Sequence, residues 1–379
     1  MTPPGAKMPA PRKERDEIDG NASFVRAWIE SGAMLSLGGG RVLVGAGVPR
    51  LLGDAPAAAS FFAPDFFLDD PCPFREYPDT RVASVADLTE ALGRTALDAA
   101  RATFGPPSRA AFDRDLAEIR ELFRAGALLK AVPVVTRSAR IAWTPGVRAR
   151  VLRNALRRSE TAPTFAYGTW DSHEGVIGAT PELLVEVARD GSLRTMALAA
   201  TRAEAEVGVR SSSLLEDPKE AEEHRIVVEA IRDDVSRFGD VRTGPTREVR
   251  LPGLTHLRTD IEVRTDRTPR LTDVVGALHP TPALGAYPKL PGLEWLRRAD
   301  ARSPKPRGRF GAPFGAVLGD LADADAPLAS CVVAIRGVRW RGEDSFVAAG
   351  CGVVPQSDPD REWAETLAKL ETVERLLYP

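Results

Sequence analysis

Cysteine is scarce in this chain, and long apolar runs are absent from it. Only 3 of the 379 residues are cysteines (Cys72, Cys331 and Cys351), and no CxxC pair occurs. This argues against a disulfide framework and against a cysteine zinc site, so we expect a cytoplasmic protein in a reducing compartment. No apolar run approaches the ~20 residues of a membrane span. The basic residues near the N-terminus precede no apolar stretch, so we expect neither a secretory signal nor a membrane partner.

An excess of positive charge is also missing. The 51 basic residues face 53 acidic ones, for a formal net charge of −2, which argues against a nucleic-acid partner. Lysine is especially rare, because 7 of the basic residues are lysines and 44 are arginines. Arginine does not lose its proton at working pH, whereas lysine can. A lysine kept in an apolar segment therefore indicates a place where an amine is needed.

The composition is that of a globular protein with a sizeable core, with 43% hydrophobic and 27% charged residues. Residues 1–20 are Pro-rich and charged and are expected to form a flexible tail. Residues 50–80, rich in Pro, Asp and Phe, are expected to form a long irregular loop with buried aromatic side chains. Helical spacing and capping residues predict helices at 110–125, 217–237 and 358–377.

Strand patterns fill much of the remaining sequence. They predict two strands within 163–190, around TFAYGTW and ELLVEV with a GATP turn between them, and further strands at 127–135, 331–340 and 345–354. Pro133 indicates that the strand at 127–135 is an edge strand or contains a bulge. Helices and strands are mixed, with no clear linker and no internal repeat. The sequence therefore predicts an α+β class with a large, mainly antiparallel sheet system.

The predicted C-terminal helix carries three charged residues on one face. Asp358 can cap it and Pro359 suits its first position. At 100° per residue, Glu362, Glu365 and Lys369 fall within about 60° of arc. Two carboxylates and a lysine so placed can hold Mg²⁺ together with an anion. The alternative is a solvated face with ion pairs along it.

The helix predicted at 217–237 carries paired carboxylates. Asp217 can cap it, and Glu220 stands at the position of a capping box. Glu223 shares a stripe with apolar residues, and so does Glu222, so one of the two should point inward. A buried carboxylate without a partner is costly, which implies a metal or another cation. The alternative is that both reach water at the edge of the helix.

Two basic residues lie in apolar segments. Arg336 interrupts CVVAIRGV, a strand with two apolar faces, and there it needs an anion, for which a carboxylate is the best match. An internal Asp or Glu would also satisfy it. Lys130 in LLKAVPVV can act as a general base once it is shielded from water, or it can form a structural salt bridge. Glu182 in GATPELL and His256 in LTHLRTD are ambiguous when taken alone.

Taken together and in order, these segments resemble the chorismate-utilising enzymes, which include isochorismate synthases, salicylate synthases, and the large subunits of anthranilate and aminodeoxychorismate synthases. The matching blocks are GATPELL, LAATR, DPKEAEEHRIVV, LTHLRTDI, LHPTPALGAYPK, RGRFGAPFG, CVVAIR and AAGCGVVPQSDPDREWAETLAKL. They span residues 125–379, and residues 21–120 match only loosely. The resemblance implies a β-sheet sandwich flanked by helices, in a single chorismate-binding domain over 21–379 whose catalytic part is 125–379.

The resemblance also implies roles for individual residues. Glu182 matches the general acid that protonates the departing C4 hydroxyl of chorismate, and Lys130 matches the lysine that activates water for attack at C2. The implied Mg²⁺ ligands are Glu223, Glu362 and Glu365. The implied substrate contacts are Thr201, His256, Ala283, Arg336, Gly350, Gly352 and Lys369. The implied partner is chorismate, a small dianion, and we expect a monomer.

The LHPTPA block is similar to that of isochorismate synthases, which makes isomerisation of chorismate to isochorismate the leading hypothesis. Salicylate synthesis and ammonia-dependent amination are the alternatives within the family. A third hypothesis is a chorismate-binding protein without turnover, because Ala200, Ala286 and Ala312 stand where the family usually has glycine. The spacing from Lys130 to Arg137 also exceeds the family's usual spacing. Either the chain bulges at Pro133 so that Lys130 reaches the site, or the base lies elsewhere.

Overall fold

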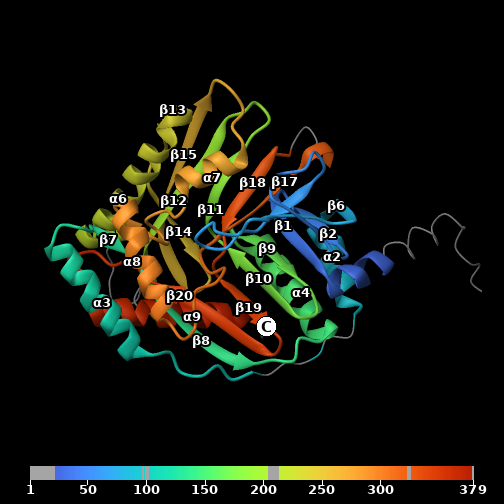
Figure 1. The fold of residues 1–379 in the computed structure, drawn as a ribbon, viewed down its shortest axis with the longest axis horizontal. Coiled ribbons are helices and arrows are strands. Elements are labelled where there is room, and N and C mark those ends of the chain that lie inside the picture. The colour runs from blue at the N-terminus through green and yellow to red at the C-terminus, as the bar shows by residue number, and fades with distance from the viewer. Residues whose placement is uncertain (1–21, 96–97, 99–101, 204–212, 322–325, 378–379) are drawn as a thin grey trace, which may run out of the picture.

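The computed structural model describes residues 22–95, 98, 102–203, 213–321 and 326–377. The flexible tail expected at 1–20 lies outside these residues. Two large antiparallel sheets and one two-stranded sheet form the framework (Figure 1). In sheet order, the eight-stranded sheet contains β6 (Asp79–Ser84), β2 (Arg41–Ala46), β1 (Gly32–Gly38), β9 (Phe165–Trp170), β10 (Glu174–Thr180), β19 (Gly337–Arg341), β20 (Asp344–Gly350) and β8 (Val134–Arg140).

The second sheet has ten strands. Its order is β13 (Gly239–Thr243), β15 (Leu254–Thr265), β12 (Leu193–Ala203), β11 (Leu183–Val187), β18 (Ala329–Val333), β17 (Pro313–Val317), β4 (Ser60–Phe62), β5 (Phe74–Glu76) and β3 (Arg50–Leu52), with β14 (Arg247–Leu251) also paired to β15. The small sheet pairs β16 (Ala286–Tyr287) with β7 (Lys130–Ala131). The two large sheets pack face to face, because one buried apolar cluster draws on both, as Leu35 and Tyr167 from one meet Phe314 and Val332 from the other.

Helices cover the outer faces of this sandwich. On the eight-stranded sheet the apolar faces of α2 (Val85–Gly93), α3 (Arg109–Arg124), α4 (Pro145–Thr161), α8 (Lys289–Arg302) and α9 (Pro359–Leu377) share a single core cluster. On the ten-stranded sheet the apolar faces of α6 (Pro218–Val235) and α7 (Leu271–Leu278) share a second core cluster. Three short 3₁₀ turns lie at Leu214–Glu216, Ser236–Phe238 and Gly319–Leu321. The predicted α+β sandwich is therefore confirmed. Across the described ranges no helix is long and apolar enough to span a membrane.

The predicted helices are confirmed together with their caps. Asp217 accepts hydrogen bonds from the amides of Lys219 and Glu220, and Asp358 accepts from the amides at the start of α9. Gly126, with φ of 68°, lies just beyond the end of α3. Glu220 does not close a capping box, because its carboxylate turns to the Lys219 ammonium.

Three expectations about strands are wrong. Residues 50–80 contain β3, β4, β5 and the start of β6 instead of one irregular loop, although the expected aromatic residues are buried. The segment 174–180, which includes most of the predicted GATP turn, is strand β10. CVVAIRGVRW is not one strand, because β18 and β19 belong to different sheets. Arg336 stands at the crossing with φ of 55°, a backbone conformation that no apolar pattern reveals.

Candidate active site

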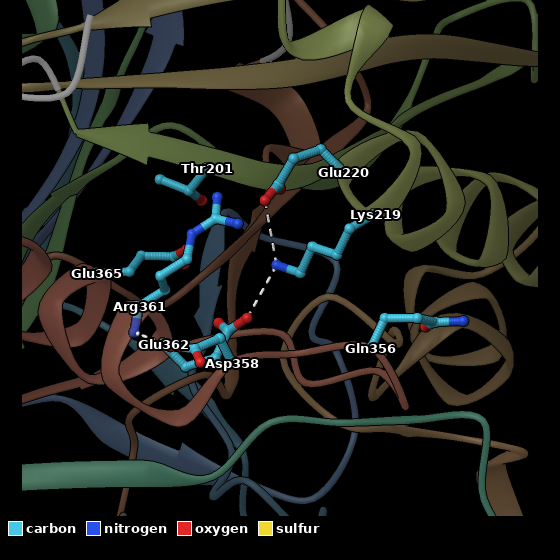
Figure 2. A pocket seen from close by; sticks show the side chains of 8 residues that line it. All are labelled: Thr201, Lys219, Glu220, Gln356, Asp358, Arg361, Glu362 and Glu365. Carbon is cyan, nitrogen blue, oxygen red and sulfur yellow. Dashed lines mark hydrogen bonds and ion pairs between the residues drawn. The ribbon is translucent and has the colours of Figure 1, made fainter. Parts of the chain in front are cut away.

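A cavity lies where α6 and α9 approach the ends of β12, β15 and β20. Its lining residues come from segments far apart in the chain: Pro181, Glu182, Leu198, Ala199, Ala200, Thr201, Glu223, His256, Ala283, Leu284, Phe310, Ile335, Arg336, Ala349, Gly350, Gly352 and Lys369. Nine of the twelve residues singled out from the sequence are in this lining. Of the remaining three, Glu362 and Glu365 line an adjoining opening (Figure 2), and Lys130 contacts Glu223 from behind the lining.

Lys130 is fully buried on β7. Its ammonium lies 3.2 Å from Glu223 Oε1 and donates to the Pro282 carbonyl at 2.9 Å. The strand is interrupted at Pro133, between β7 and β8. This interruption lets Lys130 face the site while Val134–Arg140 forms the edge strand β8 of the eight-stranded sheet. Of the two registers that the sequence left open, the one in which Lys130 reaches the carboxylates is the one observed.

Gly352 makes room for the contact between Lys130 and Glu223. A Cβ built on this glycine would collide with Glu223 Oε1 and would crowd Lys130 Cε. Any larger residue at position 352 must therefore displace one of the two charged side chains. Gly352, which the family resemblance implied as a substrate contact, provides in this structure the space in which a buried ion pair forms.

Glu182 is buried at the start of β11, directly after β10. Burial raises the pKa of Glu182 to about 7, although Lys130, Lys369 and Arg336 each draw it down. A carboxylic acid with a pKa near the working pH can give up a proton during a reaction and regain it afterwards. Glu182 therefore has the protonation chemistry that a general acid needs.

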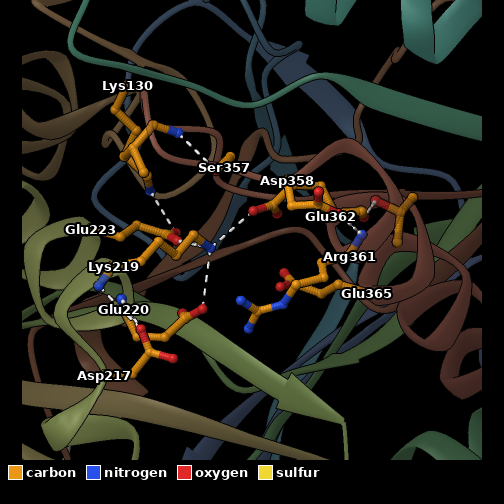
Figure 3. A network of polar contacts seen from close by, with 12 residues as sticks. Lys130, Asp217, Lys219, Glu220, Glu223, Ser357, Asp358, Arg361, Glu362 and Glu365 are labelled. Carbon is orange, nitrogen blue, oxygen red and sulfur yellow. Dashed lines mark hydrogen bonds and ion pairs between the residues drawn. The ribbon is translucent and has the colours of Figure 1, made fainter.

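Lys219 sits at the centre of a carboxylate cluster (Figure 3). Its ammonium lies 3.2 Å from Glu220 Oε1, 3.2 Å from Glu223 Oε2 and 3.0 Å from Glu362 Oε1. Burial pushes the pKa of Glu223 upward, but Lys130, Lys219 and Lys369 together outweigh it and bring that pKa to about 2. Glu223 is the inward carboxylate expected on this helix, whereas Glu222 is only partly buried and pairs with Arg225.

The same cluster is short of positive charge at its outer side. The Oε2 atoms of Glu220 and Glu362 are buried without a hydrogen-bond partner. Burial raises the pKa of Glu220 to about 7, and burial together with Glu365 raises that of Glu362 to about 7. In the described part of the chain no group of three or more His, Cys, Asp or Glu side chains is preformed around a metal position. The all-oxygen donor set and its two unpartnered oxygens nevertheless fit Mg²⁺.

Lys369 joins the cluster to the cavity. It forms an ion pair with Glu365 one turn earlier on α9, and its ammonium donates to the Gly350 carbonyl at 3.0 Å. Gly350 thus contributes a carbonyl here. On the other wall, Thr201 Oγ1 lies 3.0 Å from His256 Nδ1. Burial, with Arg336 and Lys369 nearby, holds the pKa of His256 far below its ordinary value, so this imidazole is neutral.

The Arg336 guanidinium is free for an anion. Among the described residues none forms a hydrogen bond or ion pair with it, and it lines the cavity. Burial lowers the pKa of Arg336 to about 10, against the opposing influence of Glu365 and Glu182. The guanidinium stays charged at neutral pH even so. The alternative of an internal carboxylate partner finds none within hydrogen-bonding distance among the described residues, and the predicted need for an external anion remains.

Of the three alanines that replace expected glycines, only Ala200 lines the cavity. Its φ of 61° lies in the left-handed region that favours glycine. Ala286 pairs with Ala131 in the small sheet, and Ala312 is packed in the core. Two of the three added methyl groups are therefore outside the site.

Lys219 and Glu220 are the residues that the sequence reasoning missed. Both line the opening beside the cavity, with Arg361 and Gln356 at its rim (Figure 2). The rarity of lysine could have identified Lys219. The described residues hold five lysines, and Lys130, Lys219 and Lys369 all belong to this site.

The comparison with known families agrees with this site. The family described as chorismate binding enzyme matches residues 87–378. That match covers most of the chain, including every residue of the cavity and its opening. The protein belongs to the chorismate-binding enzyme family.

Individual relatives fall into two groups of that family. The chain is 35% identical over 207 residues to the salicylate biosynthesis isochorismate synthase of Pseudomonas aeruginosa, covering 53% of this chain and 41% of that protein. It is 29% identical over 267 residues to anthranilate synthase component 1 of Neisseria meningitidis serogroup A, covering 68% and 51%. The chain thus spans about half the length of these curated relatives.

A solved structure shows the same fold. The menaquinone-specific isochorismate synthase of Escherichia coli superposes with a TM-score of 0.72 at 19% identity, covering 94% of this chain and 91% of that one. At this identity the likeness concerns the fold alone. It places the sandwich described above among those of chorismate-utilising enzymes.

Proposed function

We propose that the protein is an Mg²⁺-dependent isochorismate synthase. The observation that carries the proposal is that Glu182, whose pKa is raised to about 7, lines a cavity together with Arg336 and Lys369, while the buried Lys130 stands directly behind that lining against Glu223. Similarity to an isochorismate synthase at 35% identity supports this branch of the family, and so does the LHPTPA block at 278–283. The anthranilate synthases among the relatives make amination the competing reaction.

The reaction exchanges one water for another. The step requires Lys130 as the neutral amine, after its ammonium has released a proton to solvent. In that form Lys130 takes a proton from a water that bonds to C2 of chorismate, the ring double bond shifts, and the C4–oxygen bond breaks. Glu182 donates its proton to the departing C4 hydroxyl, which leaves as water. Atoms therefore balance, and the product is an isomer of the substrate. Both residues return to their starting protonation states by proton exchange with solvent.

The remaining residues hold the dianion. Arg336 offers a guanidinium for one carboxylate, and bidentate pairing suits it to the enolpyruvyl group. Glu223, Glu362 and Glu365 would hold the Mg²⁺, and Glu362 Oε2, which has no hydrogen-bond partner among the described residues, would be available as a ligand. When bound, Mg²⁺ supplies a Lewis-acid contact for the ring carboxylate. The side chains of Thr201 and Ala283 shape the cavity around the ring.

The test is the product. Purified protein is incubated with chorismate and Mg²⁺, with and without ammonium, and the products are separated by chromatography. The proposal expects isochorismate, with or without ammonium. Salicylate and pyruvate would instead identify a salicylate synthase, and an aminated product that forms only with ammonium would identify an aminase. Binding of chorismate without any product would identify a protein that only binds it.

A further inference from the structure

The substrate cavity adjoins two openings of opposite charge. One is the carboxylate opening of Figure 2, which shares Thr201 with the cavity lining. The other lies behind Arg336 and shares Arg336 and Pro181 with the cavity. It is lined by Arg158, Ala162, Thr164, Ala179, Pro181, Leu251, Pro252, Leu254, Arg336, Thr372 and Arg375, and we call it the arginine vestibule. It passes from exposed residues (Pro252 and Arg375) to buried ones (Ala179 and Pro181).

The arginine vestibule contains three cations and no acidic side chain. Arg158 donates to the Thr372 carbonyl at 3.0 Å, and within the described ranges neither Arg158 nor Arg375 has a carboxylate partner. The pKa of Arg158 is lowered by burial and by the neighbouring Arg375, as expected of like charges close together. Arg158 is partly buried, so its charge is costly without an anionic partner, and an anion passing between the arginines relieves that cost.

The carboxylate opening has the reverse charge. It is lined by four acidic side chains (Glu220, Asp358, Glu362 and Glu365) and by two basic ones (Lys219 and Arg361). With all four carboxylates ionised its formal charge is −2, and binding of one divalent cation would bring it to neutrality without making it positive. A dianion is therefore repelled or unassisted on this side, whereas a metal ion is attracted.

We propose that the dianionic substrate reaches the cavity through the arginine vestibule, with Arg158 and Arg375 guiding it to Arg336, while the metal ion enters by the carboxylate opening. The inference rests on the proposed function for the identity of the substrate. Separate openings let each ligand follow a favourable potential. Clefts lined by one sign of charge raise association rates by ~10- to 1,000-fold, and salt removes this gain.

Charge reversals at the two openings form the test. Arg375→Glu removes a cation from the vestibule rim, and Arg158→Gln removes the inner one with less change of shape. Arg361→Glu is the matched control, since it makes the same charge change at the exposed rim of the other opening. The measurements, at saturating Mg²⁺, are kcat and kcat/KM from 20 mM to 500 mM salt, and thermal unfolding confirms that each variant is folded.

Arg375→Glu is expected to lower kcat/KM about tenfold at low salt, with kcat unchanged and the loss shrinking at high salt. Arg158→Gln should act in the same direction, and Arg361→Glu should have a smaller effect. The inference is wrong if both vestibule variants keep the wild-type kcat/KM at every salt concentration, or if Arg361→Glu causes the larger loss. If the wild type turns nothing over, the proposed reaction fails. The rate of chorismate association, followed by stopped-flow fluorescence or by rapid filtration, then tests the vestibule independently in the same variants.

Discussion

Replacing Glu182 with glutamine should stabilise the protein at alkaline pH while it removes the reaction. Burial raises the pKa of this carboxyl from 4.5 to about 7, so the folded state holds its proton more tightly than the unfolded chain does. Stability from this group is present at pH values below about 4.5 and is lost as the pH rises through 7. At pH 8 the folded protein must keep a buried carboxylate charged. A pKa shift of this size then lowers the free energy of unfolding by about 3 kcal/mol relative to acidic pH.

Glutamine has the same shape and no charge, so the variant escapes this loss. Urea denaturation of the wild type and of Glu182→Gln at pH 5 and pH 8 measures the effect. We expect nearly equal stabilities at pH 5 and a variant more stable by about 3 kcal/mol at pH 8. Glu174→Gln serves as the control, because Glu174 is an exposed residue on β10 that pairs with Arg341, and its effect should stay within about 0.5 kcal/mol.

The catalytic activity of Glu182→Gln should fall even though its stability rises. Loss of the acid should lower kcat by ~10²- to 10⁴-fold, whereas calorimetry should still detect chorismate binding. In the wild type the rate should fall as the pH rises through about 7, because Glu182 must be protonated to act. A stability difference that does not change between pH 5 and pH 8, or a variant within a few-fold of wild-type activity, would refute the assignment of Glu182 as a buried acid.

Four further predictions concern the rest of the site. Glu362→Gln should abolish Mg²⁺-dependent activity and lower Mg²⁺ affinity in calorimetry without unfolding the protein; full wild-type activity in excess chelator would contradict this. Lys130→Arg should fail almost as badly as Lys130→Ala in steady-state kinetics, since arginine cannot take a proton from water, and an active Lys130→Arg would mean that the residue supplies only charge. Gly352→Ala should disrupt the ion pair between Glu223 and Lys130, with a loss of about 2 kcal/mol in denaturation and of activity; a neutral effect would show that the cluster can shift. Ala200→Gly should stabilise the fold by about 1 kcal/mol in the same assay, because the backbone there has φ of 61°, and a destabilised variant would show that the methyl group packs usefully.

Helices that carry site residues were predictable because their signals are local. Caps at Asp217 and Asp358 and the 100° spacing of α6 and α9 place Glu223, Glu362 and Lys369 on defined faces before any contact is known. Their meeting depends on the packing of both helices against the sandwich. The contact between Lys219 and Glu362 at 3.0 Å joins two helices that are far apart in sequence, and neither helix pattern contains it.

Arg336 shows where pattern reasoning stops. Apolar residues on both sides of it are consistent with one buried strand, yet the chain turns there from one large sheet into the other. The turn requires a positive φ at a non-glycine residue, which costs about 1 kcal/mol or more and persists only where surrounding packing fixes it. Propensity therefore argues against the observed conformation. The crossing directs the guanidinium into the space between the cavity and the arginine vestibule.

The distribution of lysine connects composition to chemistry. In a chain that uses arginine almost everywhere, Lys130, Lys219 and Lys369 all lie around Glu223 and together hold its pKa near 2. An ammonium is a compact point charge, whereas a guanidinium is a planar fork. The compact ammonium of Lys219 suits a position about 3 Å from three carboxylates, and Gly352, which has no room for a Cβ, leaves little space around Lys130 and Glu223. A larger guanidinium would not replace these ammonium groups without moving their neighbours, so the retained lysines mark the carboxylate cluster that we propose as the metal site.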